Sequence, residues 1–170
     1  MTAQTRYILM GIESFMRARV QHYNEKKYWK MRARVIDPKD KAPKLLKMWW
    51  LYRIKRSDAF NNATMGTHIG YGATFSTPPH LPHGLYGIVV SHNAVFGKNC
   101  TIFHQVTVGE GKGGAPTVGD NCFIGAGAKL IGGIKIGNNV RIGANCVVFE
   151  DVPDNCTVVL DKPRYIVREE

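Results

Sequence analysis

The chain has no long apolar run and comparatively few acidic residues. Its 170 residues include 23 Lys and Arg against 13 Asp and Glu, which gives a formal net charge of +10. A membrane-spanning helix needs about 20 mostly apolar residues, and no stretch of the sequence meets that requirement. The N-terminus also lacks the pattern of a secretory signal peptide. We therefore expect a cytoplasmic protein with one main domain.

Cysteine is also scarce, with four residues in the whole chain. None of them has the spacing of a zinc site, so we expect no resident metal. Cys100, Cys122 and Cys146 fall at equivalent positions of the repeat described below. We interpret them as small core residues of a protein in a reducing compartment.

The positive charge is concentrated in the N-terminal third, between Arg17 and Arg56. Apolar periodicity predicts helices over residues 7–36 and 45–56, and two prolines separate them. Such a basic segment could face a membrane surface, a nucleic acid or an anionic substrate, or it could be a solvated helix face. Nothing in it resembles a nucleic-acid recognition motif, so we expect no nucleic-acid partner. Trp49 and Trp50 are expected to pack on a neighbouring element, and an interfacial membrane helix is the alternative.

The most informative feature is an apolar residue at every sixth position, interrupted by a single ten-residue step. An α-helix repeats every 3.6 residues and a strand every two, so neither explains this pattern. A period of six is typical of a parallel β-helix built from hexapeptides. The repeating residues, which we call the beat, are Val90, Phe96, Ile102, Val108, Val118, Ile124, Leu130, Ile136, Ile142 and Val148.

A second line of small or apolar residues lies four positions after every beat residue except Val108. These residues are Ala94, Cys100, Val106, Cys122, Ala128, Ile134, Val140, Cys146 and Val152. Both lines predict a three-sided prism in which three hexapeptides form a coil of 18 residues and the beat side chains stack inside. Asn tolerates the left-handed backbone of a sharp turn, so we place Asn93, Asn99, Asn121, Asn138, Asn139 and Asn145 at corners.

We therefore predict a mainly β fold, a left-handed parallel β-helix with a short N-terminal α-helical segment. The left-handed coil is typical of hexapeptide prisms and is an exception to the usual crossover rule. The predicted divisions are a basic helical segment over 1–62, the β-helix over 63–158 and a tail over 159–170.

Two departures from the repeat mark the expected working face, because insertions in a solenoid bulge outward there. Residues 77–84 read as an irregular Pro-rich loop, and residues 110–116 add four residues to one coil. Ile69 and Phe75 are predicted as earlier inward residues, with Ala73 at a corner.

The motif string resembles the hexapeptide acyltransferases, and within them the serine acetyltransferase branch, over roughly residues 65–168. The resemblance implies a homotrimer with active sites between subunits and acetyl transfer from acetyl-CoA. It rests on residues 83–90 (HGLYGIVV), 106–109 (VTVG), 124–128 (IGAGA), 142–144 (IGA) and the pair Val152-Pro153.

His83 matches the catalytic histidine of that family, with one extra residue before the Gly-Ile-Val-Val string. A neutral imidazole can accept the proton of an acceptor hydroxyl as it attacks a thioester. The alternative is a histidine bonded to its own loop. His104 is the second candidate, for substrate binding, for orienting His83 or for a structural role, and His80 and His68 are weaker candidates.

The resemblance also implies a cofactor site. Gly109 and Ala126 match positions whose backbone binds the pantetheine arm of CoA, and Ala144 continues that line. Lys162 and Arg164 match a basic tail near the nucleotide, where cations can pair with CoA phosphates.

Two departures from the serine acetyltransferase pattern bear on the acceptor. Pro82 stands where that family has Asp before the catalytic histidine, and Gly114-Ala115 stand where it has an Arg-His pair. We therefore expect a carbohydrate hydroxyl as the acceptor, on a small molecule or an oligosaccharide in surface polysaccharide biosynthesis. In these departures the sequence resembles the capsule and exopolysaccharide branch of these enzymes. A peripheral contact of the protein with the membrane is left open. The alternatives are a serine O-acetyltransferase of cysteine biosynthesis and a non-catalytic hexapeptide scaffold.

Overall fold

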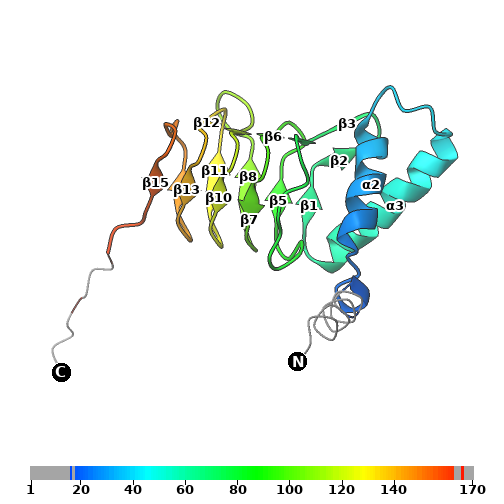
Figure 1. Ribbon diagram of the computed structural model, residues 1–170, viewed down its shortest axis with the longest axis horizontal. Coiled ribbons are helices and arrows are strands. Elements are labelled where there is room, and N and C mark those ends of the chain that lie inside the picture. Colours follow the sequence, from blue (N-terminus) through cyan, green and yellow to red (C-terminus); the bar gives the residue numbers. More distant parts are fainter. Residues whose placement is uncertain (1–15, 17, 163–165, 167–170) are drawn as a thin grey trace, which may run out of the picture.

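The computed structural model describes residue 16, residues 18–162 and residue 166. Two helices, α2 (Glu25–Ile36) and α3 (Lys44–Phe60), pack against each other at one end of a long β-helix (Figure 1). Within the described part of the chain, neither is long and apolar enough to cross a membrane. The helices therefore form a cap on the first coils.

The predicted helix over 7–36 is interrupted, so that prediction is wrong in the part that can be compared. Met16 and residues 18–20 are helical, the chain leaves the helix over residues 21–24, and α2 then begins at Glu25. The Asn24 side chain accepts a hydrogen bond from the Lys27 N–H at 3.0 Å, which is a standard N-cap. Residues 7–15 lie outside the described residues.

The β-helix has three faces of parallel strands. A short antiparallel hairpin lies between its first two strands, β1 and β4, in the sequence. The first face contains β1 (Thr64–Met65), β5 (Val89–Val90), β8 (Thr107–Gly109), β11 (Lys129–Ile131) and β14 (Val147–Val148). The second contains β7 (Thr101–Ile102), β10 (Phe123–Ile124), β13 (Arg141–Ile142) and β15 (Thr157–Val158). The third contains β4 (Thr74–Phe75), β6 (Val95–Phe96), β9 (Thr117–Val118) and β12 (Lys135–Ile136), and the hairpin pairs β2 (Thr67–His68) with β3 (Tyr71–Gly72).

The strand register confirms the predicted coil. Val90 lies opposite Val108, one 18-residue coil later, and Ile124 lies opposite Ile142 in the same way. Every beat residue is at most 6% exposed. Burying such a side chain contributes roughly 1.5–3 kcal/mol, so the stacked beat supplies most of the core's stability. The predicted fold class, a left-handed parallel β-helix of hexapeptide repeats, is confirmed.

Asparagine occupies one line of corners, as predicted, and its side chains form a ladder. Asn99, Asn121 and Asn139 have φ values of 55–57°, in the left-handed region. Each donates from Nδ2 to the next Asn along the axis, at 3.3, 3.2 and 2.9 Å, and the ladder ends at Asn155. Asn145 also has a positive φ, but Asn93 and Asn138 do not. Asn138 instead accepts a hydrogen bond from the Asp120 N–H, so it supports its corner through its side chain.

The first coil differs from the prediction at two places. Ile69 is 41% exposed in the turn of the β2–β3 hairpin and is not an inward residue, and the buried residue at this level is Met65. Leu81, six residues after Phe75, is buried, and His80 pairs in parallel with Thr101. The Pro-rich segment therefore keeps the beat, because Pro is compatible with the extended backbone of a short solenoid strand.

Candidate active site

A bulge at one corner of the first complete coil carries His83. Val90 lies nine positions after Leu81, whereas Val108 lies six positions after Ile102 in the next coil. The Gln105 N–H donates to the Tyr86 carbonyl, and Gly87 and Gln105 both have positive φ, so the two coils are in register again at Tyr86. The three extra residues are therefore His83-Gly84-Leu85, at the corner between the second and first faces.

This bulge is held on the protein from two sides. Leu85 and Ile88 are fully buried in the core, and the Gly87 N–H donates to the Asn61 carbonyl at the end of α3, at 2.9 Å. A methyl group on Gly84 would lie 3.0 Å from the Gln21 side-chain oxygen, so the segment before α2 touches the bulge directly. The His83 loop is thus fixed by buried apolar residues and by the helical cap.

The bulge brings His83 against His104. The two rings lie 4.8 Å apart between centroids and are nearly perpendicular, at 85°. Phe103 contributes a third ring, 5.7 Å from that of His83. His83 is exposed, so an acceptor can reach it from solvent. The two predicted catalytic residues, which are 21 positions apart in the sequence, therefore form one cluster.

His104 is half-buried, and its Nδ1 atom is buried without a hydrogen-bond partner among the described residues. Buried polar atoms nearly always have a partner, and exceptions are found where a ligand or a water completes the bond. The unpaired Nδ1 belongs to the ring that lies against His83.

Ala126 and Ala144 continue the His104 corner along the axis. The Gly127 N–H donates to the His104 carbonyl at 3.0 Å, and the Asn145 N–H donates to the Ala126 carbonyl at 2.8 Å. Ala126 is half-buried and Ala144 exposed, so small side chains line this edge beyond the two histidines. Such an edge suits an extended chain such as the pantetheine arm.

The other predicted cofactor residues lie elsewhere. Gly109 ends β8, at the opposite end of the first face from this corner, so one chain does not bring Gly109 and Ala126 together. Lys162 is exposed beyond β15, and Arg164 lies outside the described residues.

The inserted loop 110–116 leaves the β-helix at that opposite corner. Glu110 accepts hydrogen bonds from Ser91 Oγ at 2.7 Å and from Asn93 Nδ2 at 2.6 Å, and these bonds lower the pKa of the Glu110 carboxyl. Gly111 pairs with Gly114. The Gly113 carbonyl packs so closely on Gly133 that a side chain at position 133 would collide with this carbonyl. The loop is therefore anchored at its start and packed on the next coil.

The remaining candidate histidines do not join the cluster. His80 is exposed on the strand before the bulge, and His68 stacks on Tyr71 in the β2–β3 hairpin, 4.7 Å away. Within the described ranges, no group of three or more His, Cys, Asp or Glu is placed to hold a metal ion. An exposed imidazole beside a half-buried one can serve as a proton acceptor and a substrate-binding group.

Sequence reasoning missed one residue, Asn61, that supports this cluster. Asn61 Nδ2 donates to the Gln21 carbonyl and to the Ser57 carbonyl, while the Asn61 carbonyl accepts from Gly87. Asn61 thus joins the segment before α2, the end of α3 and the His83 loop. An Asn after a helix carries no signal of such a role, because its partners are distant in sequence.

Comparisons with known proteins agree with the fold. Residues 115–150 match the profile of the family described as bacterial transferase hexapeptide (six repeats). The serine acetyltransferase of Synechococcus elongatus is 44% identical over 107 residues, which are 61% of this chain and 43% of the relative. That of Staphylococcus aureus (strain Mu50) is 42% identical over 109 residues, or 62% of this chain and 50% of the relative. The chain spans about half the length of the curated relatives it matches.

Solved structures of the same group are similar in shape. Serine acetyltransferase isoform 3 of Entamoeba histolytica, in complex with cysteine, has a TM-score of 0.59 and 28% identity, covering 72% of this chain and 44% of that chain. The Neisseria gonorrhoeae serine acetyltransferase in complex with serine has a TM-score of 0.55 and 32% identity, covering 88% of this chain and 55% of that chain.

These relatives correct the expected acceptor. The carbohydrate acceptor and the link to surface polysaccharide biosynthesis were inferred from Pro82 and from Gly114-Ala115, and that inference is wrong. The proteins with 42–44% identity are named serine acetyltransferases, and one solved relative holds serine. Pro82 and Gly114-Ala115 are local differences, whereas the identity extends over more than 100 residues. The matched repeats, the three-faced coil and the similar structures together place this chain in the hexapeptide-repeat transferase superfamily.

Proposed function

We propose that the protein is a serine O-acetyltransferase that uses acetyl-CoA as the donor. The observation that carries this proposal is the 42–44% identity with serine acetyltransferases over more than 100 residues of the chain. The pairing of His83 with His104, at a ring distance of 4.8 Å, supports it. A non-catalytic scaffold would not need a three-residue bulge that presents an exposed imidazole.

In this proposal His83 is the general base. Its neutral imidazole accepts the proton of the serine hydroxyl as the hydroxyl oxygen attacks the thioester carbonyl of acetyl-CoA. The tetrahedral intermediate collapses with cleavage of the carbon–sulfur bond, and the imidazolium returns the proton to the departing CoA thiolate. The acetyl group moves directly from sulfur to oxygen, so no acyl-enzyme is formed.

His104 takes the substrate-binding role. Its ring is half-buried and lies against the exposed His83 ring, so its accessible edge can hydrogen-bond an acceptor that reaches His83. Such a bond would also compensate in part for the missing Arg-His pair at Gly114-Ala115, since the acceptor then has a polar contact beside His83.

The protein acts as a homotrimer in this proposal, with each site between two subunits. Ala126, Ala144 and Lys162 of one subunit hold the pantetheine arm and the nucleotide end. Gly109 lies at the opposite end of the first face, so we assign it to the cofactor groove of the site on the neighbouring subunit. Light scattering tests the assembly, and a mass of about three times the 19.0 kDa chain is expected.

The decisive experiment measures release of the CoA thiol from acetyl-CoA with L-serine. Removing a general base typically costs about 10²–10⁴ in rate, so His83→Ala is expected to lose activity by that factor. His80→Ala is the matched control, because it removes an exposed histidine from the neighbouring strand. The proposal fails if wild type shows no L-serine-dependent release, and the base assignment fails if His83→Ala remains active.

Peripheral membrane contact stays a prediction, and fewer residues of the basic segment are exposed to support it than the sequence suggests. Trp49 and Tyr52 are more than half exposed on α3, while Trp50 packs against the core. Lys47, which belongs to the basic N-terminal segment, is buried, and its Nζ lies 3.7 Å from Asp40 Oδ1. Sedimentation with anionic vesicles tests the remaining surface, and unchanged binding after Lys44→Gln with Trp49→Ala would contradict the prediction.

A further inference from the structure

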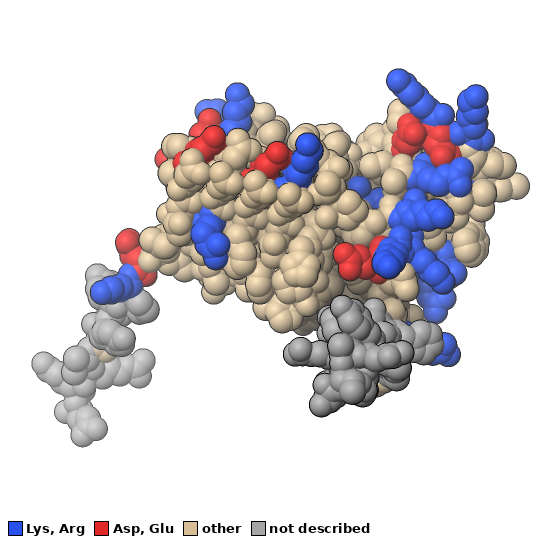
Figure 2. Space-filling view, viewed as in Figure 1, with Lys and Arg blue, Asp and Glu red and all other residues tan. Residues whose placement is uncertain are grey.

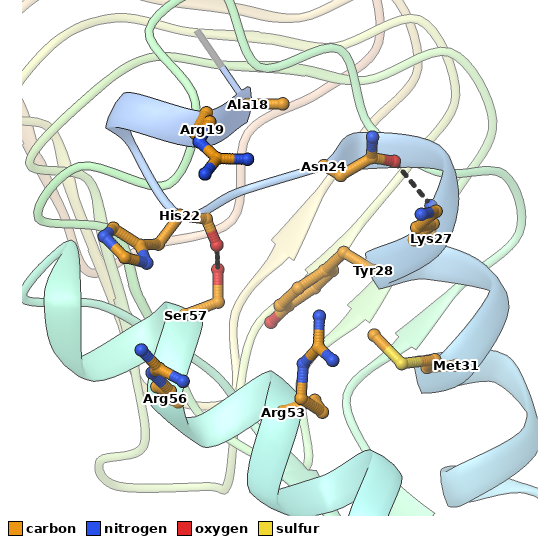
Figure 3. Close-up of a pocket in the computed structure, with 10 residues that line it drawn as sticks. All are labelled: Ala18, Arg19, His22, Asn24, Lys27, Tyr28, Met31, Arg53, Arg56 and Ser57. Carbon is orange, nitrogen blue, oxygen red and sulfur yellow. Dashed lines mark hydrogen bonds between the residues drawn. The ribbon is translucent and has the colours of Figure 1, made fainter. Parts of the chain in front are cut away.

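A cavity of about 580 Å³ lies at the helical end, separate from the His83 cluster. Its walls come from the turn before α2, from the first turns of α2 and from the C-terminal half of α3 (Figure 3). The residues that line it are Ala18, Arg19, His22, Asn24, Lys27, Tyr28, Met31, Arg53, Arg56 and Ser57.

The lining is strongly cationic. It contains Arg19, Lys27, Arg53 and Arg56, and it includes no Asp or Glu. None of these four cations forms an ion pair with another residue of the described part, in contrast to Arg34 and Lys47, which both pair with Asp40. Figure 2 shows Lys and Arg gathered over this end of the molecule. Four like charges around one cavity repel one another, and a bound anion would remove that cost.

The one carboxylate bonded to a lining residue does not neutralise the cavity. Asp58 accepts a hydrogen bond from the Tyr28 hydroxyl at 2.7 Å, and its side chain is buried. Asp58 is itself not among the lining residues. Among the described residues, the cationic groups of the cavity therefore have no anionic counterpart on its walls.

The walls are held in place before any ligand arrives. The Ser57 hydroxyl donates to the His22 carbonyl at 2.9 Å, which fixes the turn against α3 (Figure 3). The His22 ring lies 4.2 Å from that of Phe60, and the Arg53 guanidinium lies over Trp49. A prearranged site loses less entropy on binding than a flexible cationic surface does.

We infer that this cavity binds a small molecule that carries two or more phosphate groups, such as a nucleoside di- or triphosphate. Guanidinium groups form paired hydrogen bonds with phosphate oxygens, and three of the four cations are arginines. The volume falls within the roughly 300–1,000 Å³ of small-molecule pockets. Tyr28 and Met31 supply an apolar wall for the body of the ligand. This inference does not depend on the proposed acetyltransferase activity.

Calorimetric titration of the full chain tests the inference, with ATP and with inorganic pyrophosphate at fixed ionic strength. Wild type is expected to bind at least one of the two. Arg53→Gln with Arg56→Gln is expected to weaken binding by about tenfold or more, because two charged hydrogen-bond donors are lost. Lys41→Gln with Lys44→Gln is the matched control, since it removes the same charge from exposed positions that do not line the cavity.

Three results would overturn the inference. These are no binding of either compound by wild type at millimolar concentration, equal weakening in the two double variants, and binding only to vesicles that carry phosphorylated lipids. Circular dichroism confirms that each variant is folded, and Lys27→Gln provides a second variant from the other helix. An unweakened Lys27→Gln together with an unweakened arginine double variant would also contradict the site.

Discussion

Replacing Arg32 by Met is expected to destabilise the protein more than any other single change on α2. Arg32 is 2% exposed between the helices and the first coil. It donates hydrogen bonds to the carbonyls of Met65 and Ala73, at 2.9 and 2.6 Å, and to Thr67 Oγ1 at 3.1 Å. Met fills a similar volume but offers no donor, so the Ala73 carbonyl would lose its Arg32 bond and the Met65 carbonyl would keep only a long bond of 3.5 Å from the Thr67 hydroxyl.

The magnitude follows from these contacts. Each buried carbonyl left without a partner costs about 1–3 kcal/mol. The guanidinium also lies 5.3 and 4.9 Å from the rings of Trp29 and Phe75, and these contacts are lost as well. Part of the loss is regained, because burial lowers the pKa of Arg32 to about 10 and Met removes a desolvated charge. We expect a net loss of about 3 kcal/mol.

The assay is urea and thermal unfolding at one protein concentration, since assembly makes the transition depend on concentration. For a chain of this size, 3 kcal/mol corresponds to a fall in Tm of roughly 6–12 °C. Lys30→Met is the matched control, because Lys30 is exposed on the same helix. Equal stability of Arg32→Met and Lys30→Met would refute the assignment of Arg32 as the link between cap and coils.

Two further predictions concern the cap and the corners. Burial raises the pKa of Asp58 to about 6, above its unfolded value, so the stability that its protonated form provides is complete below about pH 4 and is lost as the pH rises through 6. The free energy of unfolding of wild type, relative to that of Asp58→Asn, is therefore expected to fall by up to about 3 kcal/mol between pH 4 and pH 7. Urea titrations that show a constant or rising difference between the two proteins would contradict this prediction. At Asn121, whose φ is 57°, Ala is expected to cost about 1 kcal/mol more than Gly, because a Cβ strains the left-handed backbone. Equal denaturation midpoints for the two variants would argue against that strain.

The coils could be predicted from the sequence because each beat residue is buried at an equivalent position of the coil, at a fixed interval along the chain. Ile102, Ile124 and Ile142 stack at equivalent positions, so their pattern is local and repeats. The insertion at 110–116 was visible for the same reason, since it breaks a known period. Leu81 was missed because the surrounding prolines look like a loop, although Pro is compatible with an extended solenoid strand.

The cap could not be predicted in this way. Arg32 and Asp58 read as members of a charged helical segment, and their burial depends on partners more than 25 residues away. The candidate site was only partly visible. His83 and His104 were both candidates in the sequence, but the contact between them depends on the three-residue bulge and on Asn61.

The position of the two helices has a consequence for self-association. A stack of parallel strands ends in unpaired N–H and C=O groups, which can recruit a strand from another molecule. Here α3 packs on β1, the first strand of one face, and α2 packs on the β2–β3 hairpin, so the N-terminal end of the coil is covered (Figure 1). A form of the protein that lacked these helices would present those edges to solvent, and we expect it to add strands end to end and grow into filaments.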